Sequence, residues 1–143
     1  MTHNIDGGTM TFSRLRYHIV TATKGRKPLI TERIEATIYE AMRARAEALG
    51  STVCAIGGVD DHIHLLAAIP PHMSVSSTVG KLKGWSSRQV HELFPSHDDF
   101  AWQVGFSAFT VSPGDVPRVA SYVRNQKIRH ELGELWEKWE RPG

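Results

Sequence analysis

Two histidines separated by one apolar residue, His62-Ile63-His64, begin an apolar run that continues to Ile69. Because side chains alternate between the two faces of a β-strand, both imidazoles project from one face while Ile63 points to the other. The apolar residues that follow place this strand at the centre of a sheet, where a polar ring without a partner is costly to bury. Two imidazoles whose Cα atoms are about 6–7 Å apart can share a metal ion. The pattern therefore predicts a pair of metal ligands on one face of a sheet; the alternative is two histidines on a half-solvated strand.

The remaining patterns predict a small α+β domain with the order β-α-β-β-α-β-α. Strands are expected over residues 14–22, 52–58, 62–69 and 100–111, and helices from Thr31 to before Gly50, from a Ser74 cap to before Pro95, and from an Asp115 cap to about Leu132. The first six elements match the ferredoxin-like split βαβ arrangement, an antiparallel sheet with helices on one face and the other face free for function. At 143 residues, one domain over residues 14–143 is expected after a mobile N-terminal tail at residues 1–13. Residues 134–143 are expected to be amphipathic or loose.

The composition excludes several classes of protein. Hydrophobic residues make up 41% and charged residues 22%, as in a folded chain and unlike a disordered one. No run approaches the ~18 apolar residues of a membrane span, and the first residues lack the features of a secretory signal. The single cysteine, Cys54, excludes an internal disulfide and fits a reducing compartment. We therefore expect a cytoplasmic protein, and the net charge of +2 neither requires nor excludes a nucleic-acid partner.

A tyrosine on the third predicted helix forms the second notable pattern. Gln126 follows Tyr122 by four residues, so both side chains are expected on one helix face, which Arg118 and Arg129 extend. The tyrosine is expected to be half exposed, and such a residue can also be purely structural. The opposite side is apolar and is expected to dock on the sheet: Val116, Val119, Ala120 and Val123.

In combination, these patterns resemble the HUH nucleases, which are named for histidine-apolar-histidine. Within that group the chain resembles the single-tyrosine transposases of bacterial insertion sequences and their repeat-associated relatives. The resemblance covers about residues 14–131 in the family's order, and its specific part is HxH followed by Trp-Gln and then Tyr-x3-Gln. The matching stretches are YHIVTATKGRKPLI, GGVDDHIHLLAAIPP, VGKLKGWSS, FAWQVGFSAFTVS and VPRVASYVRNQKIRHE.

The resemblance implies a transposase that cuts and rejoins single-stranded DNA. Tyr122 would be the nucleophile, forming a 5′-phosphotyrosine and a free 3′-hydroxyl, and His62, His64 and Gln126 would bind a divalent metal. A tyrosine hydroxyl has a pKa of about 10 and is a weak nucleophile at neutral pH, so attack on a phosphodiester benefits from an ion that neutralises and orients the phosphate. Mg²⁺ or Mn²⁺ is expected, and Mn²⁺ suits nitrogen ligands better.

The resemblance also implies partners. With one tyrosine per chain, strand exchange implies a homodimer, and the turn SPGDVP before the tyrosine helix is a candidate hinge for exchanging that helix. Relatives recognise DNA hairpins near element ends, so a hairpin is expected. Cations neutralise phosphates and aromatic rings stack on unpaired bases. The candidate DNA-binding residues, each of which can also be ordinary surface, are Lys24, Arg26, Lys27, Lys81, Lys83, Trp85, Arg88, Arg118, Arg124, Lys127 and Arg129.

The chain departs from the family pattern at two places. Val104 and Phe106 stand where relatives often carry an arginine and a tyrosine, which affects the expected DNA contacts. Arg129 and His130 stand where relatives often have paired histidines, and neither is assigned a catalytic role.

Three other functions compete with the transposase interpretation. The first is a domesticated protein of the same fold that binds single-stranded DNA without cutting it. The second is a zinc hydrolase that uses His62 and His64 with a third histidine such as His91 or His97. The third is a two-histidine phosphoesterase, which would need two H-x-[ST] motifs, whereas only His72-Met73-Ser74 fits.

Overall fold

The computed structural model describes residues 4–6, 9–11 and 13–133. Its centre is a four-stranded antiparallel sheet in the order β4-β5-β3-β6. The strands are β3 (Arg16–Ala22), β4 (Thr52–Gly58), β5 (His62–Ala68) and β6 (Ser107–Thr110). The two central strands are β5 and β3, which confirms the central position that the sequence predicted for the histidine strand. This order confirms the predicted ferredoxin-like α+β arrangement.

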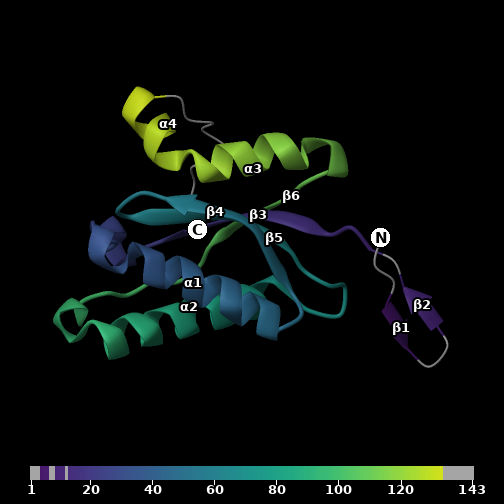
Figure 1. The fold of residues 1–143 in the computed structure, drawn as a ribbon, viewed down its shortest axis with the longest axis horizontal. Coiled ribbons are helices and arrows are strands. Elements are labelled where there is room, and N and C mark those ends of the chain that lie inside the picture. The colour runs from purple at the N-terminus through teal and green to yellow at the C-terminus, as the bar shows by residue number, and fades with distance from the viewer. Residues whose placement is uncertain (1–3, 7–8, 12, 134–143) are drawn as a thin grey trace.

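Helices cover both faces of the sheet, which gives three layers (Figure 1). One face carries α1 (Glu32–Ala48) and α2 (Val75–Leu93), and the other carries α3 (Val116–Arg124), followed by α4 (Gln126–Leu132). Short 3-10 turns complete the fold: η1 (Lys24–Arg26), η2 (Pro95–His97) and η3 (Pro113–Asp115). The face that was expected to be free is therefore covered by α3. None of the helices that the structure describes is long and apolar enough to cross a bilayer.

Alternate residues of β5 supply two separate cores. Ile63 and Leu65 pack with α1 and α2 in the larger core, and Leu66 packs with α3 in the smaller one. This alternation follows from the two-residue period of a strand. Each fully buried Leu or Ile contributes about 1.5–3 kcal/mol relative to an exposed one, so both helix layers are held by ordinary hydrophobic burial. The same alternation turns His62 and His64 toward α3.

Local signals set the ends of α1 and α2 as the sequence predicted. Ile34, Ile38 and Met42 recur at helical spacing on the buried side of α1, and Gly50 follows the helix with a φ of 83° that favours glycine. The Ser74 side chain accepts a hydrogen bond of 3.0 Å from the backbone N–H of Ser77 at the start of α2.

The third predicted helix is in fact two helices. Asn125, with φ −100° and ψ 26°, separates α3 from α4, so the prediction of one helix to Leu132 was wrong. The predicted exposure of Tyr122 was also wrong, because its side chain is fully buried. The tyrosine lies on the docked side of α3 together with Val119 and Val123. Because α3 covers the imidazoles of the sheet, a phenol on its buried side has polar neighbours. The spacing of apolar residues along the helix does not reveal such a position.

The last predicted strand is shorter than residues 100–111. Only Ser107–Thr110 form β6, and Trp102 makes an isolated bridge with Thr23. Gly105 interrupts the run with a φ of 93°, outside the range of extended strands.

Residues 4–6 and 9–11 pair as a short antiparallel hairpin, β1 (Asn4–Asp6) with β2 (Thr9–Thr11). They fall in the tail that was expected to be mobile, and its mobility stays a prediction. Residues 134–143, expected to be amphipathic or loose, lie outside the described residues.

Gly57 of β4 allows α3 to approach the sheet closely. A Cβ atom there would collide with the backbone carbonyl oxygen of Val123 at the end of α3. We therefore expect Gly57→Ala to push α3 off the sheet and to lower the free energy of unfolding by about 1–3 kcal/mol. Chemical denaturation measures this loss, and hydrogen exchange should show faster exchange in α3.

Gly84→Ala on α2 is the matched control, because a Cβ at Gly84 meets no atom within 4 Å. Alanine is a better helix former, so this variant should be more stable by up to about 1 kcal/mol. A Gly57→Ala protein as stable as the wild type would contradict the close packing of α3 on β4.

Candidate active site

His62 and His64 lie side by side on the face of β5 that α3 covers. Their side chains are almost fully buried, and their ring centroids are 5.2 Å apart. Two imidazoles that bind one ion through nitrogens at about 2.0–2.1 Å have ring centroids roughly 5 Å apart. The spacing of the pair therefore fits two ligands of a single metal ion.

Tyr122 packs against this pair from α3 of the same chain. Its ring lies 5.7 Å from that of His64 and meets it edge-on, with an interplanar angle of 78°. The Arg129 guanidinium carbon lies 4.9 Å from the centre of the tyrosine ring. Docking of α3 on the sheet thus brings the phenol and the imidazoles together although 58 residues separate Tyr122 from His64 (122 − 64).

Gln126 lies at the start of α4, immediately after the break at Asn125. Its side chain is fully buried, and its Nε2 donates a hydrogen bond of 3.1 Å to the backbone oxygen of Tyr122. Its Oε1 accepts a hydrogen bond of 3.1 Å from Nε2 of His130, whose ring lies 5.1 Å from that of His62. A carbonyl oxygen has two lone pairs, so Oε1 can accept this hydrogen bond and still bind a cation.

His130 is the first residue of this site that the sequence analysis left without a role. Its position could have been recognised from spacing, because it follows Gln126 by four residues, and residues at this spacing share one face of a helix. The structure places it between Gln126 and His62.

Asp61 is the second residue that was missed. Its Oδ1 lies 2.7 Å from Nδ1 of His62, and because a carboxylate only accepts hydrogen bonds, Nδ1 carries the hydrogen. Nε2 of His62 is then left with the lone pair that a metal requires. Arg26 Nη2 lies 3.3 Å from the same Nδ1, but arginine only donates, so we assign the hydrogen bond to the shorter carboxylate contact.

The third missed residue is His18 of β3, which is fully buried and contacts His64. The signal was strand alternation: His18 lies between Tyr17 and Ile19, which pack with the larger core, so its side chain projects from the opposite face, that of the histidine pair.

An open pocket of about 510 Å³ reaches His62 from the surface. Arg26 and Lys127 line it, together with Val59, Asp60, Asp61, His62 and His130. Arg26 has a φ of 52°, in the left-handed region that costs a non-glycine residue about 1–2 kcal/mol. Lys127 pairs with Glu35 of α1 and donates a 3.0 Å hydrogen bond to the backbone oxygen of Gly58, which holds α4 over the end of β4. The cationic side chains of Arg26 and Lys127 therefore line the pocket through which His62 is reached.

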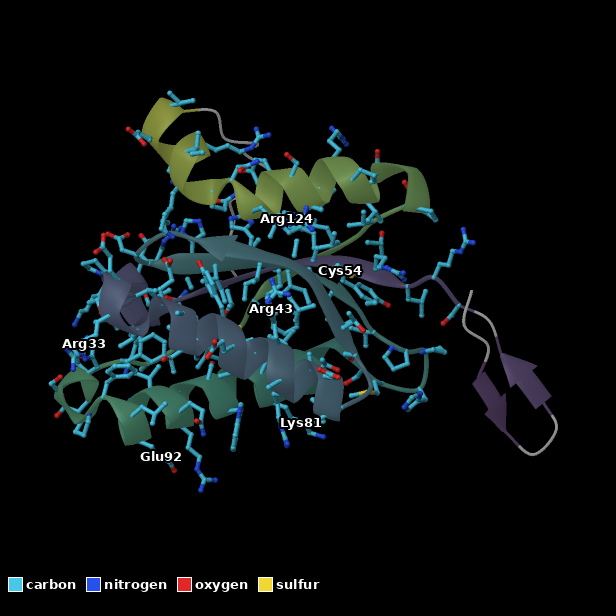
Figure 2. All side chains as sticks on the ribbon, in the orientation of Figure 1. Arg33, Arg43, Cys54, Lys81, Glu92 and Arg124 are labelled. Atoms are coloured by element: carbon cyan, nitrogen blue, oxygen red, sulfur yellow. The ribbon has the colours of Figure 1, made fainter. Side chains whose placement is uncertain are left out.

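The predicted DNA-binding residues divide into two groups. Figure 2 shows Lys81 and Arg124 on opposite sides of the sheet, on α2 and α3. The α2 residues therefore lie on the far face from the histidines: Lys81, Lys83, Trp85 and Arg88. The others lie on η1, directly after it, or on α3 and α4: Lys24, Arg26, Lys27, Arg118, Arg124, Lys127 and Arg129.

Several of these side chains have partners within the chain. The Lys83 ammonium donates hydrogen bonds to the backbone oxygens of Gln103 (2.6 Å) and Gly105 (2.8 Å), and burial lowers its pKa. Lys83 therefore holds the loop before β6, a structural role that the sequence did not reveal. Two guanidinium groups lie near the Trp85 ring, with Cζ atoms 5.8 Å (Arg45) and 5.9 Å (Arg88) from its centre.

The donor set around the histidine pair limits which metals fit. Across residues 4–6, 9–11 and 13–133, no three His, Cys, Asp or Glu side chains are grouped so that they could hold a metal ion. His91 and His97, the third ligands considered for a zinc hydrolase, contact other groups: His91 lies 2.8 Å from the Phe100 oxygen, and His97 lies 3.0 Å from Thr31 Oγ1. Two imidazoles and one amide oxygen could hold a divalent ion and leave coordination positions open for water or phosphate.

Known proteins resemble this chain in sequence and in fold. The sequence model of the family "Transposase IS200 like" matches residues 11–126. The transposases for insertion sequence element IS200 from Salmonella typhimurium and Salmonella typhi are each 31% identical to this chain over 125 residues, which covers 83% of this chain and 81% of theirs.

Two solved structures are similar in fold. A candidate transposase from Deinococcus radiodurans R1 superposes with a TM-score of 0.66 at 25% identity, over 85% of this chain and 98% of that one. A REP-associated tyrosine transposase bound to a REP hairpin gives a TM-score of 0.63 at 13% identity, over 92% of this chain and 81% of that one. The fold is thus that of the tyrosine transposases. The chain belongs to the IS200-like transposase family.

Proposed function

We propose that this transposase cuts and rejoins single-stranded DNA through a covalent bond between Tyr122 and a 5′-phosphate, assisted by a divalent ion. The observation that carries the proposal is the placement of the Tyr122 ring 5.7 Å from His64, which itself lies 5.2 Å from His62. A phenol beside two imidazoles with the spacing of shared metal ligands is expected in a phosphoryl-transfer site.

Each side chain has a defined part in the proposed reaction. Nε2 of His62, His64 and Oε1 of Gln126 would hold Mn²⁺ or Mg²⁺, which supplies Lewis-acid stabilisation of charge on the scissile phosphate. The Tyr122 oxygen attacks phosphorus, forming the Tyr–O–P bond while the P–O3′ bond breaks. The phenol proton passes to solvent, and the leaving 3′-oxygen takes up a proton from solvent to become a 3′-hydroxyl. In rejoining, a 3′-hydroxyl attacks the same phosphorus and releases Tyr122. One phosphodiester replaces another at each step, so no ATP is required.

Access to the tyrosine requires movement in the proposed mechanism. Tyr122 is fully buried and does not line the pocket that reaches His62, whereas Arg26, Lys127 and His130 do. A backbone phosphate would enter between Arg26 and Lys127, and α3 and α4 would shift to let it lie beside Tyr122. The break at Asn125 and the contacts of Lys127 with Glu35 and Gly58 are where this shift would occur.

We propose a DNA hairpin as the partner, with cations on both faces of the protein. The REP-associated relative is bound to a REP hairpin in its structure. In this chain, the cations around the pocket would bind the strand to be cut. Lys81, Arg88 and the ring of Trp85 form a second basic and aromatic surface on α2 that suits unpaired bases.

We further propose that two copies of the chain act together, because each supplies one Tyr122 and the exchange of two strands needs two. Here Tyr122 lies on the sheet of its own chain, so each copy would supply a complete site. Light scattering of the protein with hairpin DNA tests this: a dimer is expected, and full cleavage activity from a species that is monomeric throughout would contradict it.

The test of the proposed function uses a 3′-labelled pool of single-stranded oligonucleotides in which a stem-loop is followed by a randomised segment. With Mn²⁺, a labelled protein–DNA adduct that survives denaturing gel electrophoresis is expected, and EDTA should abolish it. The fully duplexed pool is the control and should give no adduct. Binding of the pool without any adduct, in Mn²⁺ and in Mg²⁺, would contradict the proposal and favour the non-catalytic DNA-binding alternative.

A further inference from the structure

We propose that His18 is a positioning residue that fixes the ring and the tautomer of His64, so that His64 presents Nε2 to the metal. This inference rests on the proposed function, because it assumes that His64 is a metal ligand. The two imidazoles contact one another directly, with His18 Nε2 and His64 Nδ1 2.8 Å apart, and both side chains are fully buried.

The register of the sheet brings His18 and His64 into contact. β3 and β5 are antiparallel, with His18 opposite Leu66 and Val20 opposite His64, so the two histidines are diagonal neighbours on the same face. Their ring centroids are 5.1 Å apart. The Tyr122 ring, 6.2 Å from that of His18, and the Phe109 ring, 5.9 Å away, pack against His18 from two further sides. These rings leave His18 little freedom to rotate away from His64.

The chemistry of the contact decides which nitrogen carries the hydrogen. A neutral imidazole has one N–H and one lone pair. If His18 donated, Nδ1 of His64 would be the acceptor, and the single hydrogen of His64 would then occupy Nε2 and block it as a ligand. If His64 donates from Nδ1 to Nε2 of His18, Nε2 of His64 carries the lone pair that would bind the ion. Only the second arrangement is compatible with metal binding.

Both proposed ligand histidines are then oriented in the same way. Nδ1 of His62 donates to the carboxylate of Asp61 at 2.7 Å, and Nδ1 of His64 donates to His18 at 2.8 Å. The two acceptors differ in charge and burial: the Asp61 side chain is 26% exposed, whereas His18 is completely buried. A neutral acceptor at His18 orients His64 without placing an unpaired carboxylate in the core, which would be costly.

The geometry does not favour His18 as a third metal ligand. Its Nε2 faces His64, and His18, His62 and His64 do not form a three-ligand metal group among the described residues. Partners of ligating histidines typically change metal affinity by about 10–100-fold when they are removed, without contacting the ion.

The first test is Mn²⁺ affinity without DNA, measured from the electron paramagnetic resonance signal of free Mn²⁺. His18→Phe keeps a ring but removes the acceptor, so it should weaken binding about 10–100-fold. His18→Gln keeps an acceptor oxygen near the position of Nε2 and should bind Mn²⁺ much more tightly than His18→Phe. His72→Phe, at an exposed position, is the control and should bind like the wild type. Circular dichroism confirms that each variant is folded.

The second test needs no substitution. In protein labelled with ¹⁵N-histidine, long-range ¹H–¹⁵N spectra of the metal-free state should show the hydrogen of His64 on Nδ1 and none on Nε2. The opposite tautomer would overturn the inference, as would wild-type affinity in a folded His18→Phe protein or equal losses in His18→Phe and His18→Gln.

Failure of this inference is distinguishable from failure of the proposed function. If only the role of His18 is wrong, wild-type protein still binds Mn²⁺ and still forms the DNA adduct. If the wild type binds no Mn²⁺ and forms no adduct, the metal site itself is wrong, and the inference about His18 falls with it.

Discussion

Replacing Tyr122 by phenylalanine is expected to abolish the covalent protein–DNA adduct while the fold survives. Phenylalanine keeps the ring that packs against His64 and Val123 but removes the oxygen that would attack phosphorus. Loss of a nucleophile should lower the rate of adduct formation by at least about 1,000-fold. Removing one buried hydroxyl should change the free energy of unfolding by only about 1–2 kcal/mol. Denaturing gels with labelled DNA, and a urea titration, measure the two effects.

The other two tyrosines of the chain are natural controls. Tyr17 packs with the larger core, on the other face of the sheet, and Tyr39 lies on α1. Burial, followed by the charge of Glu35, raises the pKa of the Tyr39 phenol, which makes it a poorer nucleophile. Tyr17→Phe and Tyr39→Phe should therefore both form the adduct at close to the wild-type rate. An adduct that persists in Tyr122→Phe would mean that another residue is the nucleophile.

His64→Ala is expected to eliminate both Mn²⁺ binding and DNA cleavage. It removes one of the two imidazoles that lie 5.2 Å apart, and with it the group that connects His18, His62 and Tyr122. Since Lewis-acid assistance is worth several kcal/mol in such sites, cleavage should fall by at least about 100-fold. His62→Ala should have the same effects. The control is His97→Ala, because His97 lies on η2 and contacts Thr31. This variant should bind Mn²⁺ and cleave DNA normally.

Mixing the two inactive variants tests whether each chain forms its own site. Tyr122 packs on His64 of the same chain. If this arrangement is the active one, a mixture of Tyr122→Phe and His64→Ala proteins should not recover cleavage. Recovery to a substantial fraction of the wild-type rate would show that the tyrosine helix acts on the sheet of a partner, with the turn before α3 as its hinge.

The histidine face could be predicted because strand periodicity is a local property. Alternation in His62-Ile63-His64, followed by an apolar run, was sufficient to place both imidazoles on one face of a central strand, and the structure confirms that geometry. The ferredoxin-like order could be predicted for the same reason, since each strand and helix carries its own apolar period and its own cap.

The depth and completeness of the site could not be predicted, because they depend on contacts between distant segments. Tyr122 is buried because Gly57 lets the backbone of α3 touch β4, and nothing in the helix sequence reports that approach. The break at Asn125, which carries no proline or glycine signal, turns Gln126 inward. His18 depends on the pairing of β3 with β5, a register that only the folded sheet defines.

The division of basic residues between two faces was likewise invisible in the sequence. Lys81, Lys83 and Arg88 were grouped with the residues around Tyr122, yet α2 lies across the sheet from α3. In addition, the Lys83 ammonium donates hydrogen bonds to two backbone oxygens. A DNA that contacts both faces must therefore wrap around an edge of the sheet. The positions of the basic residues in the sequence do not predict this path.

Mass spectrometry of the covalent adduct identifies the residue that is joined to the DNA. Wild-type protein is incubated with the labelled oligonucleotide pool and Mn²⁺, the DNA is trimmed with nucleases, and the peptides are mapped. We expect a nucleotide joined through its 5′-phosphate to Tyr122, in an amount that EDTA reduces to background. A nucleotide on Tyr17, Tyr39 or any other residue, or a Tyr122 adduct whose yield does not depend on the metal, would contradict the proposed function.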